Sequence, residues 1–151
     1  MRINLLYDSP DVRSGYVNVD PFAIDDKNKV CSDLQSLSFC SVGEAQEILC
    51  HNILSYYNLQ DASSIFSEVV SKLAHGGVVT ISDVNAYEVS RQFVVGKISP
   101  TEFSSILLGD KHSRKSLHSI DTILEGFKQF NLQIVAKKIE GFNFSVSAVR
   151  P

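Results

Sequence analysis

The chain has 151 residues, 44% of them hydrophobic and 21% charged, which predicts one soluble domain, residues 1–151, that folds without disulfides or metals. A formal net charge of -3 leaves no basic footprint and argues against nucleic acid as a partner. The three cysteines have neither zinc-ligand nor disulfide-framework spacing. Because no apolar run has the form of a signal peptide or reaches membrane-spanning length, we expect a cytoplasmic protein with no membrane contact.

The N-terminal stretch contains two β-rich runs, residues 2–7 and 16–20, and an aspartate stands at the end of each, Asp8 and Asp20. The connection between the runs is too short for the helix that usually joins parallel strands. If the two strands are parallel, the first crossover helix is therefore missing. Asp20 closes the second strand, where the carboxylate of a nucleotide-binding sheet can accept from both ribose hydroxyls. The alternative is an aspartate that only ends a strand.

The middle of the chain predicts a strand, a helix and a second strand. The expected elements are a short strand over residues 29–32, a buried strand over 47–52, a helix over 61–73 and a strand over 78–83. Asp61 is the expected N-cap of the helix, and Gly76-Gly77 is its expected end. This order of elements forms a βαβ unit, which places the domain in the α/β class.

The C-terminal part of the chain predicts three helices and a hairpin. Residues 85–95 can be helical, and Ser99-Pro100-Thr101-Glu102 has the pattern of a helix start with a capping box. Ser119 can cap a further helix. The chain ends with two apolar runs around Glu140-Gly141, which we expect to form an antiparallel hairpin.

The order of these parts resembles a class I S-adenosylmethionine-dependent methyltransferase of the compact type, whose chain opens on the first strand. The segments that carry the resemblance are residues 15–20, 72–83 and 148–151. The resemblance implies a Rossmann-like methyltransferase fold with a mostly parallel sheet, an antiparallel C-terminal hairpin and S-adenosylmethionine as the cofactor. The short first connection adds that the first crossover helix of this fold is missing.

The resemblance also implies roles for side chains near the strand ends. Asp20 would accept from the ribose, and Asp33 with Leu34 would flank the adenine. Cys50 and His51 would lie beside the methionine arm of the cofactor. The implied cofactor-binding residues are Leu6, Tyr7, Asp8, Asp20, Asp33, Leu34 and Cys50.

One segment departs from the family pattern. Leu6-Tyr7-Asp8 stands where the family has a glycine-rich turn, typically G-x-G. Glycine lets the backbone approach the cofactor closely, whereas side chains at these positions obstruct the approach. If Asp8 faced the carboxylate of the cofactor at about 4 Å, the repulsion would be about 1 kcal/mol in water and about 4 kcal/mol at an intermediate dielectric. Asp8 could instead accept from the ammonium group of the cofactor.

Three residues are candidate general bases for catalysis, namely His51, Asp83 and His112. A histidine at the edge of an apolar run is also explained by a structural role, which is the alternative for His51. A solvated polar loop over residues 109–115 is the alternative for His112.

Two functions are open, and the resemblance favours the first. The first is an S-adenosylmethionine-dependent methyltransferase that acts on an unidentified small-molecule or glycan acceptor. The second is a catalytically inactive methyltransferase-like module for binding or regulation that pairs with a partner subunit, or with a second copy through the edge of the terminal hairpin. Asp20 and Asp33 favour the first function, and Leu6-Tyr7-Asp8 favours the second.

Overall fold

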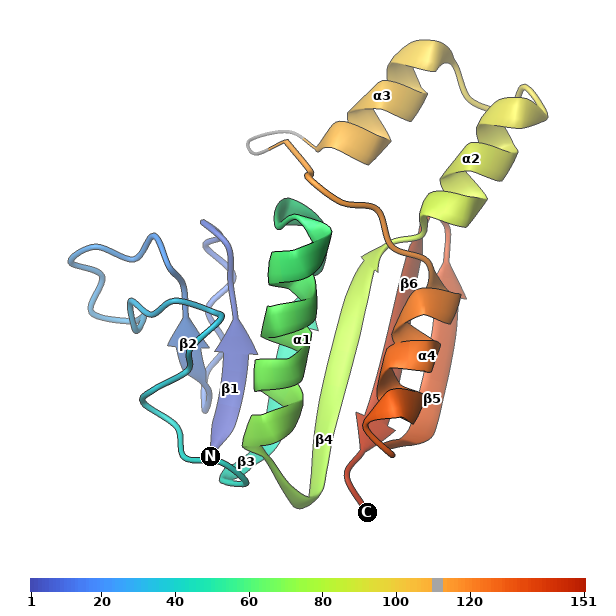
Figure 1. Cartoon of the computed structure of the whole chain (residues 1–151). Coiled ribbons are helices and arrows are strands. Elements are labelled where there is room, and N and C mark those ends of the chain that lie inside the picture. Colours follow the sequence, from blue (N-terminus) through green and yellow to red (C-terminus); the bar gives the residue numbers. More distant parts are fainter. Residues whose placement is uncertain (110–112) are drawn as a thin grey trace.

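A computed structural model describes residues 1–109 and 113–151, which form a six-stranded sheet with strand order β2-β1-β3-β4-β6-β5 (Figure 1). The strands are β1 (Arg2–Leu5), β2 (Val17–Val19), β3 (Ala45–His51), β4 (Leu73–Val84), β5 (Gln133–Glu140) and β6 (Asn143–Val149). β1 is parallel to β2 and β3, and β3 is parallel to β4, whereas β6 is antiparallel to β4 and β5. The structure confirms the predicted fold class, a mostly parallel α/β sheet that ends in an antiparallel hairpin.

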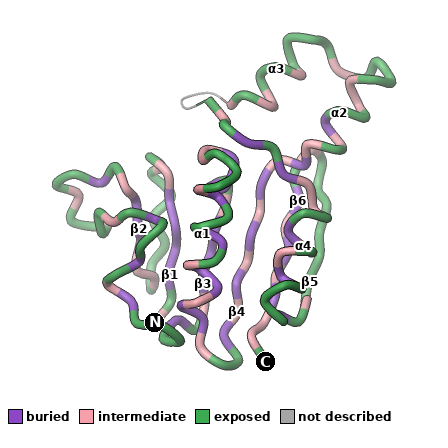
Figure 2. Tube along the Cα trace, viewed as in Figure 1, coloured by how far each residue is buried: buried purple, intermediate pink, exposed green. Residues whose placement is uncertain are grey.

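Two of the helices cover one face of this sheet. The helical elements are the 3-10 helix η1 (Leu54–Tyr56) and the α-helices α1 (Leu59–Lys72), α2 (Ala86–Val94), α3 (Pro100–Leu108) and α4 (Ile120–Gln129). α1 and α4 lie against the sheet, and their inward sides carry the buried residues (Figures 1 and 2). α2 and α3 lie beyond the carboxyl ends of the strands, where Phe93 stacks on Phe103 at 4.3 Å. No helix in the described ranges is both long and apolar enough to cross a membrane.

The two predicted signals at the ends of α1 are wrong. Asn58 is the N-cap, because its side chain accepts from the backbone N–H of Asp61 at 2.8 Å. The helix ends at Lys72, and Gly76-Gly77 lies inside β4. A Cβ at Gly77 would lie 2.7 Å from the carbonyl oxygen of Ala45 on β3. Gly77 therefore allows close strand pairing, which the sequence pattern did not distinguish from a helix end.

The predicted strand over residues 29–32 is reduced to a single parallel bridge between Val19 and Val30. The backbone N–H of Val30 donates to the Asn18 carbonyl at 2.7 Å, and that of Asp20 donates to the Val30 carbonyl at 3.0 Å. The capping box at Ser99 and the N-cap at Ser119 are both confirmed.

The first crossover helix is missing, as predicted, since the connection from β1 to β2, residues 6–16, is described throughout and contains no helix. Two buried asparagines hold the connecting loop instead. Asn4 and Asn18 are paired in register, and the Asn4 amide donates to the Asn18 side-chain oxygen at 2.9 Å and to the Asp11 carbonyl at 3.0 Å. The Asn18 oxygen also accepts from the Arg13 backbone N–H at 2.8 Å. Side-chain amides thus replace the helix in fixing this connection.

Replacing Asn18 with leucine is expected to lower the free energy of unfolding by about 2–3 kcal/mol, because the buried Asn4 amide and the part-buried Arg13 N–H lose their acceptor. Urea denaturation followed by circular dichroism measures this loss. Asn28→Leu is the matched control, since Asn28 is exposed and makes no side-chain hydrogen bond within the described ranges. Equal losses in the two variants would mean that the asparagine pair does not anchor the loop.

Candidate functional site

The candidate site lies at the carboxyl ends of the parallel strands. The chain runs from β1 to β2 on one side and continues with β3 on the other side of β1, so the strand order reverses between β1 and β3. Ligands of open α/β sheets bind at such a switch point. The segments that begin there are residues 6–16 after β1, 20–22 after β2 and 52–57 after β3.

Four aromatic rings from these segments meet at the switch point. Tyr7 stacks on Tyr56, with centroids 5.0 Å apart and planes within 6°. The edges of Tyr57 and Phe22 approach Tyr7 at centroid distances of 5.4 and 4.8 Å. Burial raises the pKa of Tyr7 and of Tyr57, so both phenols are neutral at pH 7. The rings therefore form a packed wall between the ends of β1 and β3.

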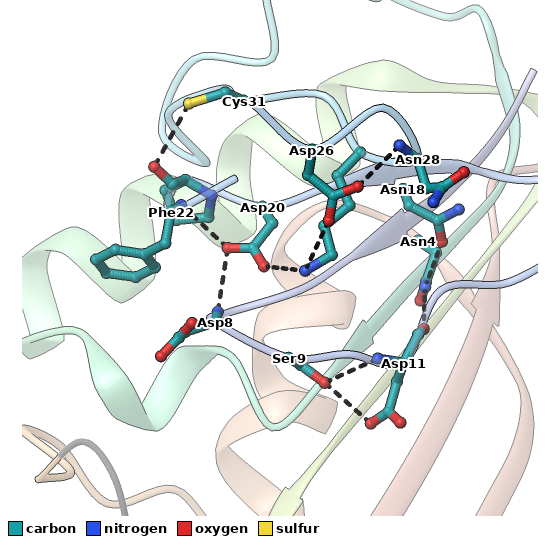
Figure 3. A network of polar contacts seen from close by, with 12 residues as sticks. Asn4, Asp8, Ser9, Asp11, Asn18, Asp20, Phe22, Asp26, Asn28 and Cys31 are labelled. Carbon is teal, nitrogen blue, oxygen red and sulfur yellow. Dashed lines mark hydrogen bonds and ion pairs between the residues drawn. The ribbon is translucent and has the colours of Figure 1, made fainter. Parts of the chain in front are cut away.

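The carboxylate of Asp20 is only 1% exposed and accepts hydrogen bonds from other groups of the same chain (Figure 3). Its Oδ1 accepts from the backbone N–H groups of Asp8 at 3.1 Å and Phe22 at 3.0 Å. Its Oδ2 accepts from the Lys29 ammonium at 3.1 Å. Burial alone would raise the pKa of Asp20, but the two backbone donors and Lys29 together hold it below its usual value. Asp20 is therefore ionised and already has three donors.

Two cavities flank the aromatic wall and share Tyr7, Ser9 and Tyr56. The first, which we call the α3-side cavity, has a volume of about 600 Å³ and is lined also by Ile106 and Arg114. The second, the loop-side cavity, has a volume of about 660 Å³ and is lined also by His51. Both have the size of small-molecule sites. Asp20 lines neither cavity.

The structure brings only some of the predicted cofactor residues together. Leu6, Tyr7 and Asp8 follow β1, and Asp8 has a positive φ of 48°. Asp33 is exposed and accepts from the Gln35 backbone N–H at 2.9 Å. The side chains of Leu34 and Cys50 are buried in the hydrophobic core, and burial raises the pKa of the Cys50 thiol. The cofactor roles given to these residues stay predictions.

The candidate general bases differ in their hydrogen bonding and in their access to a cavity. Asp83 is 1% exposed and accepts from the backbone N–H and the hydroxyl of Ser55 at 3.1 and 2.9 Å. His51 lies 2.6 Å from the Ser82 hydroxyl through its Nδ1 and borders the loop-side cavity. His112 lies outside the described residues. Of the two that can be placed, only His51 reaches a cavity.

Several residues of the site carry no signal in the sequence. Lys29 reaches Asp20 only because the loop after β2 returns to it, and Phe22 reaches Tyr7 in the same way. Arg13 lies in a connection whose sequence has no periodic pattern, so the sequence does not indicate that it lines the loop-side cavity. Ser82 could have been found, because it alternates with Ile81 and Asp83 on a strand that pairs with β3.

Comparisons with known proteins agree on the fold. No family model and no curated protein matches the sequence. Among solved structures, magnesium protoporphyrin IX methyltransferase from Synechocystis PCC 6803, solved with bound S-adenosylhomocysteine, is 14% identical, with a TM-score of 0.59 over 99% of this chain and 74% of that chain. A SAM-dependent methyltransferase from Archaeoglobus fulgidus is 11% identical, with a TM-score of 0.60 over 89% of this chain and 76% of that chain.

One methyltransferase in the comparison is much longer than this chain. An O-methyltransferase family protein from Burkholderia thailandensis is 15% identical with a TM-score of 0.54, and the match covers 78% of this chain but 33% of that chain. This chain therefore spans about a third of that protein. At these identities the matches establish a shared fold, and the fold of this chain is that of the S-adenosylmethionine-dependent methyltransferases.

The switch point, as arranged, does not fit S-adenosylmethionine. The carboxylate that would accept from the ribose already accepts three hydrogen bonds from the chain. The Tyr7 ring, stacked on Tyr56, occupies the end of β1 where the fold usually leaves room beside glycine. A bound cofactor would have to displace both features.

Proposed function

We propose that this chain is a methyltransferase-fold binding module that does not carry S-adenosylmethionine while its loops hold this arrangement. The observation that carries the proposal is the state of Asp20, whose two oxygens are bonded to Asp8, Phe22 and Lys29. Fold and function are separable, since one fold supports many activities through its sites. The alternative, an active methyltransferase with a small-molecule or glycan acceptor, requires this carboxylate for the cofactor.

The free energies of the hydrogen bonds lost and gained at Asp20 support a module without the cofactor. Ribose hydroxyls could bond Asp20 only after the Lys29 ammonium or a backbone N–H lost its acceptor. A buried donor left without an acceptor costs about 1–3 kcal/mol, more when it is charged. Each new ribose bond contributes only about 0.5–1.5 kcal/mol. The exchange therefore weakens cofactor binding even before the aromatic rings move.

Calorimetric titration with S-adenosylmethionine and S-adenosylhomocysteine tests the proposal. We expect neither compound to bind with micromolar affinity. The Synechocystis enzyme, solved with bound S-adenosylhomocysteine, is the positive control under the same conditions. Micromolar binding by this chain that disappears in Asp20→Asn would overturn the proposal, because it would mean that the ribose displaces Lys29.

A further inference from the structure

The loop-side cavity lies on the sheet face that α1 and α4 leave uncovered. His51 and Ser82 are neighbours in register on β3 and β4, and they alternate with Cys50 and Ile81, which belong to the core beneath the helices. The loop of residues 6–16 borders this face in place of the missing crossover helix. The cavity is thus a consequence of the shortened connection.

Two exposed residues of opposite charge, Arg13 and Asp11, line this cavity from the loop. In the ranges 1–109 and 113–151, the Arg13 guanidinium has no hydrogen bond or ion pair. The Asp11 carboxylate accepts from the Ser9 hydroxyl at 3.0 Å (Figure 3). The buried Asn4 and Asn18 fix the backbone of both residues, at the Asp11 carbonyl and the Arg13 N–H. The backbone that carries the two charged side chains is therefore anchored beside the cavity.

Polar groups that can either donate or accept face the same cavity. His51 Nδ1 and the Ser82 hydroxyl lie 2.6 Å apart, and Nε2 of His51 has no partner among the described residues. Burial, and to a smaller extent the charge of Arg13, lowers the pKa of His51, so its ring is neutral at pH 7. A neutral imidazole has one donor and one acceptor, and its tautomer decides which nitrogen has which role. His51 can therefore serve a carboxylate or an ammonium group.

We propose that the loop-side cavity binds a small zwitterion such as a free α-amino acid, with Arg13 facing the carboxylate and Asp11 facing the ammonium group. The inference rests on the proposed function and names the ligand class of the module. A ligand with only a negative charge would be repelled by Asp11, and one with only a positive charge by Arg13. A zwitterion satisfies both charges, and the polar groups of His51 and Ser82 can bond its remaining atoms.

Chemical-shift titration with three probes tests this assignment. L-glutamine carries both charges, acetate only the negative one and methylammonium only the positive one. We expect millimolar binding of L-glutamine, which suits a ligand of this size. It should shift the signals of the His51 ring and the Arg13 guanidinium, with weaker effects from acetate and methylammonium. No shift of these signals with L-glutamine would overturn the proposal.

Variants of the charged residues separate a ligand contact from a structural role. Arg13→Gln should weaken L-glutamine binding at least about tenfold. Arg91→Gln, on α2 and away from both cavities, should leave it unchanged. Asp11→Asn should weaken L-glutamine binding but strengthen acetate binding, an inversion that a loss of loop structure would not produce. Equal losses in Arg13→Gln and Arg91→Gln, or weaker acetate binding in Asp11→Asn, would overturn the proposal.

The two proposals fail by different readouts. Binding of S-adenosylmethionine that Asp20→Asn abolishes contradicts the proposed function. The zwitterion site fails on the L-glutamine signals of His51 and Arg13, whatever the cofactor does. S-adenosylmethionine also has an amino-acid end, so Arg13→Gln is titrated with it as well. If Arg13→Gln lost S-adenosylmethionine binding and Asp20→Asn kept it, that binding would be assigned to the loop-side cavity.

Discussion

Replacing Asp20 with alanine is expected to lower the free energy of unfolding by about 3–5 kcal/mol, the usual cost of breaking a buried ion pair by removing one partner. The change leaves the Lys29 ammonium, whose side chain is 12% exposed, without its nearest carboxylate at 3.1 Å. It also removes the acceptor of the Asp8 and Phe22 backbone N–H groups. Urea denaturation at pH 7 measures the loss.

Asp26→Ala is the matched control for this prediction. Asp26 also contacts Lys29, at 3.7 Å, but its side chain is 35% exposed. Its removal should therefore cost no more than about 1 kcal/mol, as for other exposed ion pairs. Equal losses in Asp20→Ala and Asp26→Ala would mean that the internal bonds of Asp20 contribute little and that its carboxylate is free to serve a ligand.

The pH dependence of the same variant gives a second check. The folded-state pKa of Asp20 is lowered, so the carboxylate contributes stability above the unfolded-state pKa of about 3.9. That contribution is lost as the pH falls through the folded-state pKa. The difference in stability between the wild type and Asp20→Ala should therefore shrink below about pH 4. A difference that is constant down to pH 2 would contradict the assigned charge.

Replacing Asp83 with alanine is expected to lower the free energy of unfolding by about 2–4 kcal/mol, because hydrogen bonds to a buried carboxylate are among the stronger ones. The carboxylate bonds both the backbone and the hydroxyl of Ser55, which begins the connection to α1. The Ser55 carbonyl in turn accepts from the Lys115 and Ser116 N–H groups. Asp83 therefore ties two segments beyond the sheet to β4.

The Asp83 prediction is checked by thermal and urea denaturation of Asp83→Ala beside Asp121→Ala. Asp121 is an exposed acid in the first turn of α4, where its loss should cost at most about 1 kcal/mol. If Asp83→Ala were as stable as the control, the hydrogen bonds to Ser55 would not hold these segments. The Asp83 carboxylate would then be available to act as a general base.

The fold class and most helices and strands follow from the amino-acid pattern alone. Local signals sufficed for this, because hydrophobic period and capping residues act within one element. The run over residues 47–52 became β3, the capping box at Ser99 began α3, and the short first connection predicted the missing helix. Errors arose where one local signal has two meanings, as for Gly76-Gly77, which can end a helix or allow close strand pairing.

The hydrogen bonding and packing of the candidate site depend on contacts between distant segments of the chain. The sequence indicated that Asp20 ends a strand. It did not indicate that Lys29 and two backbone N–H groups donate hydrogen bonds to Asp20, because those donors lie on irregular loops. The stacking of Tyr7 on Tyr56 likewise depends on how two strand ends lie side by side. Periodicity fixes which face of an element is buried, whereas the path of a loop depends on side-chain bonds to distant residues. The sequence therefore predicts the methyltransferase fold. Only the folded molecule shows which side chains fill the position where that fold places its cofactor.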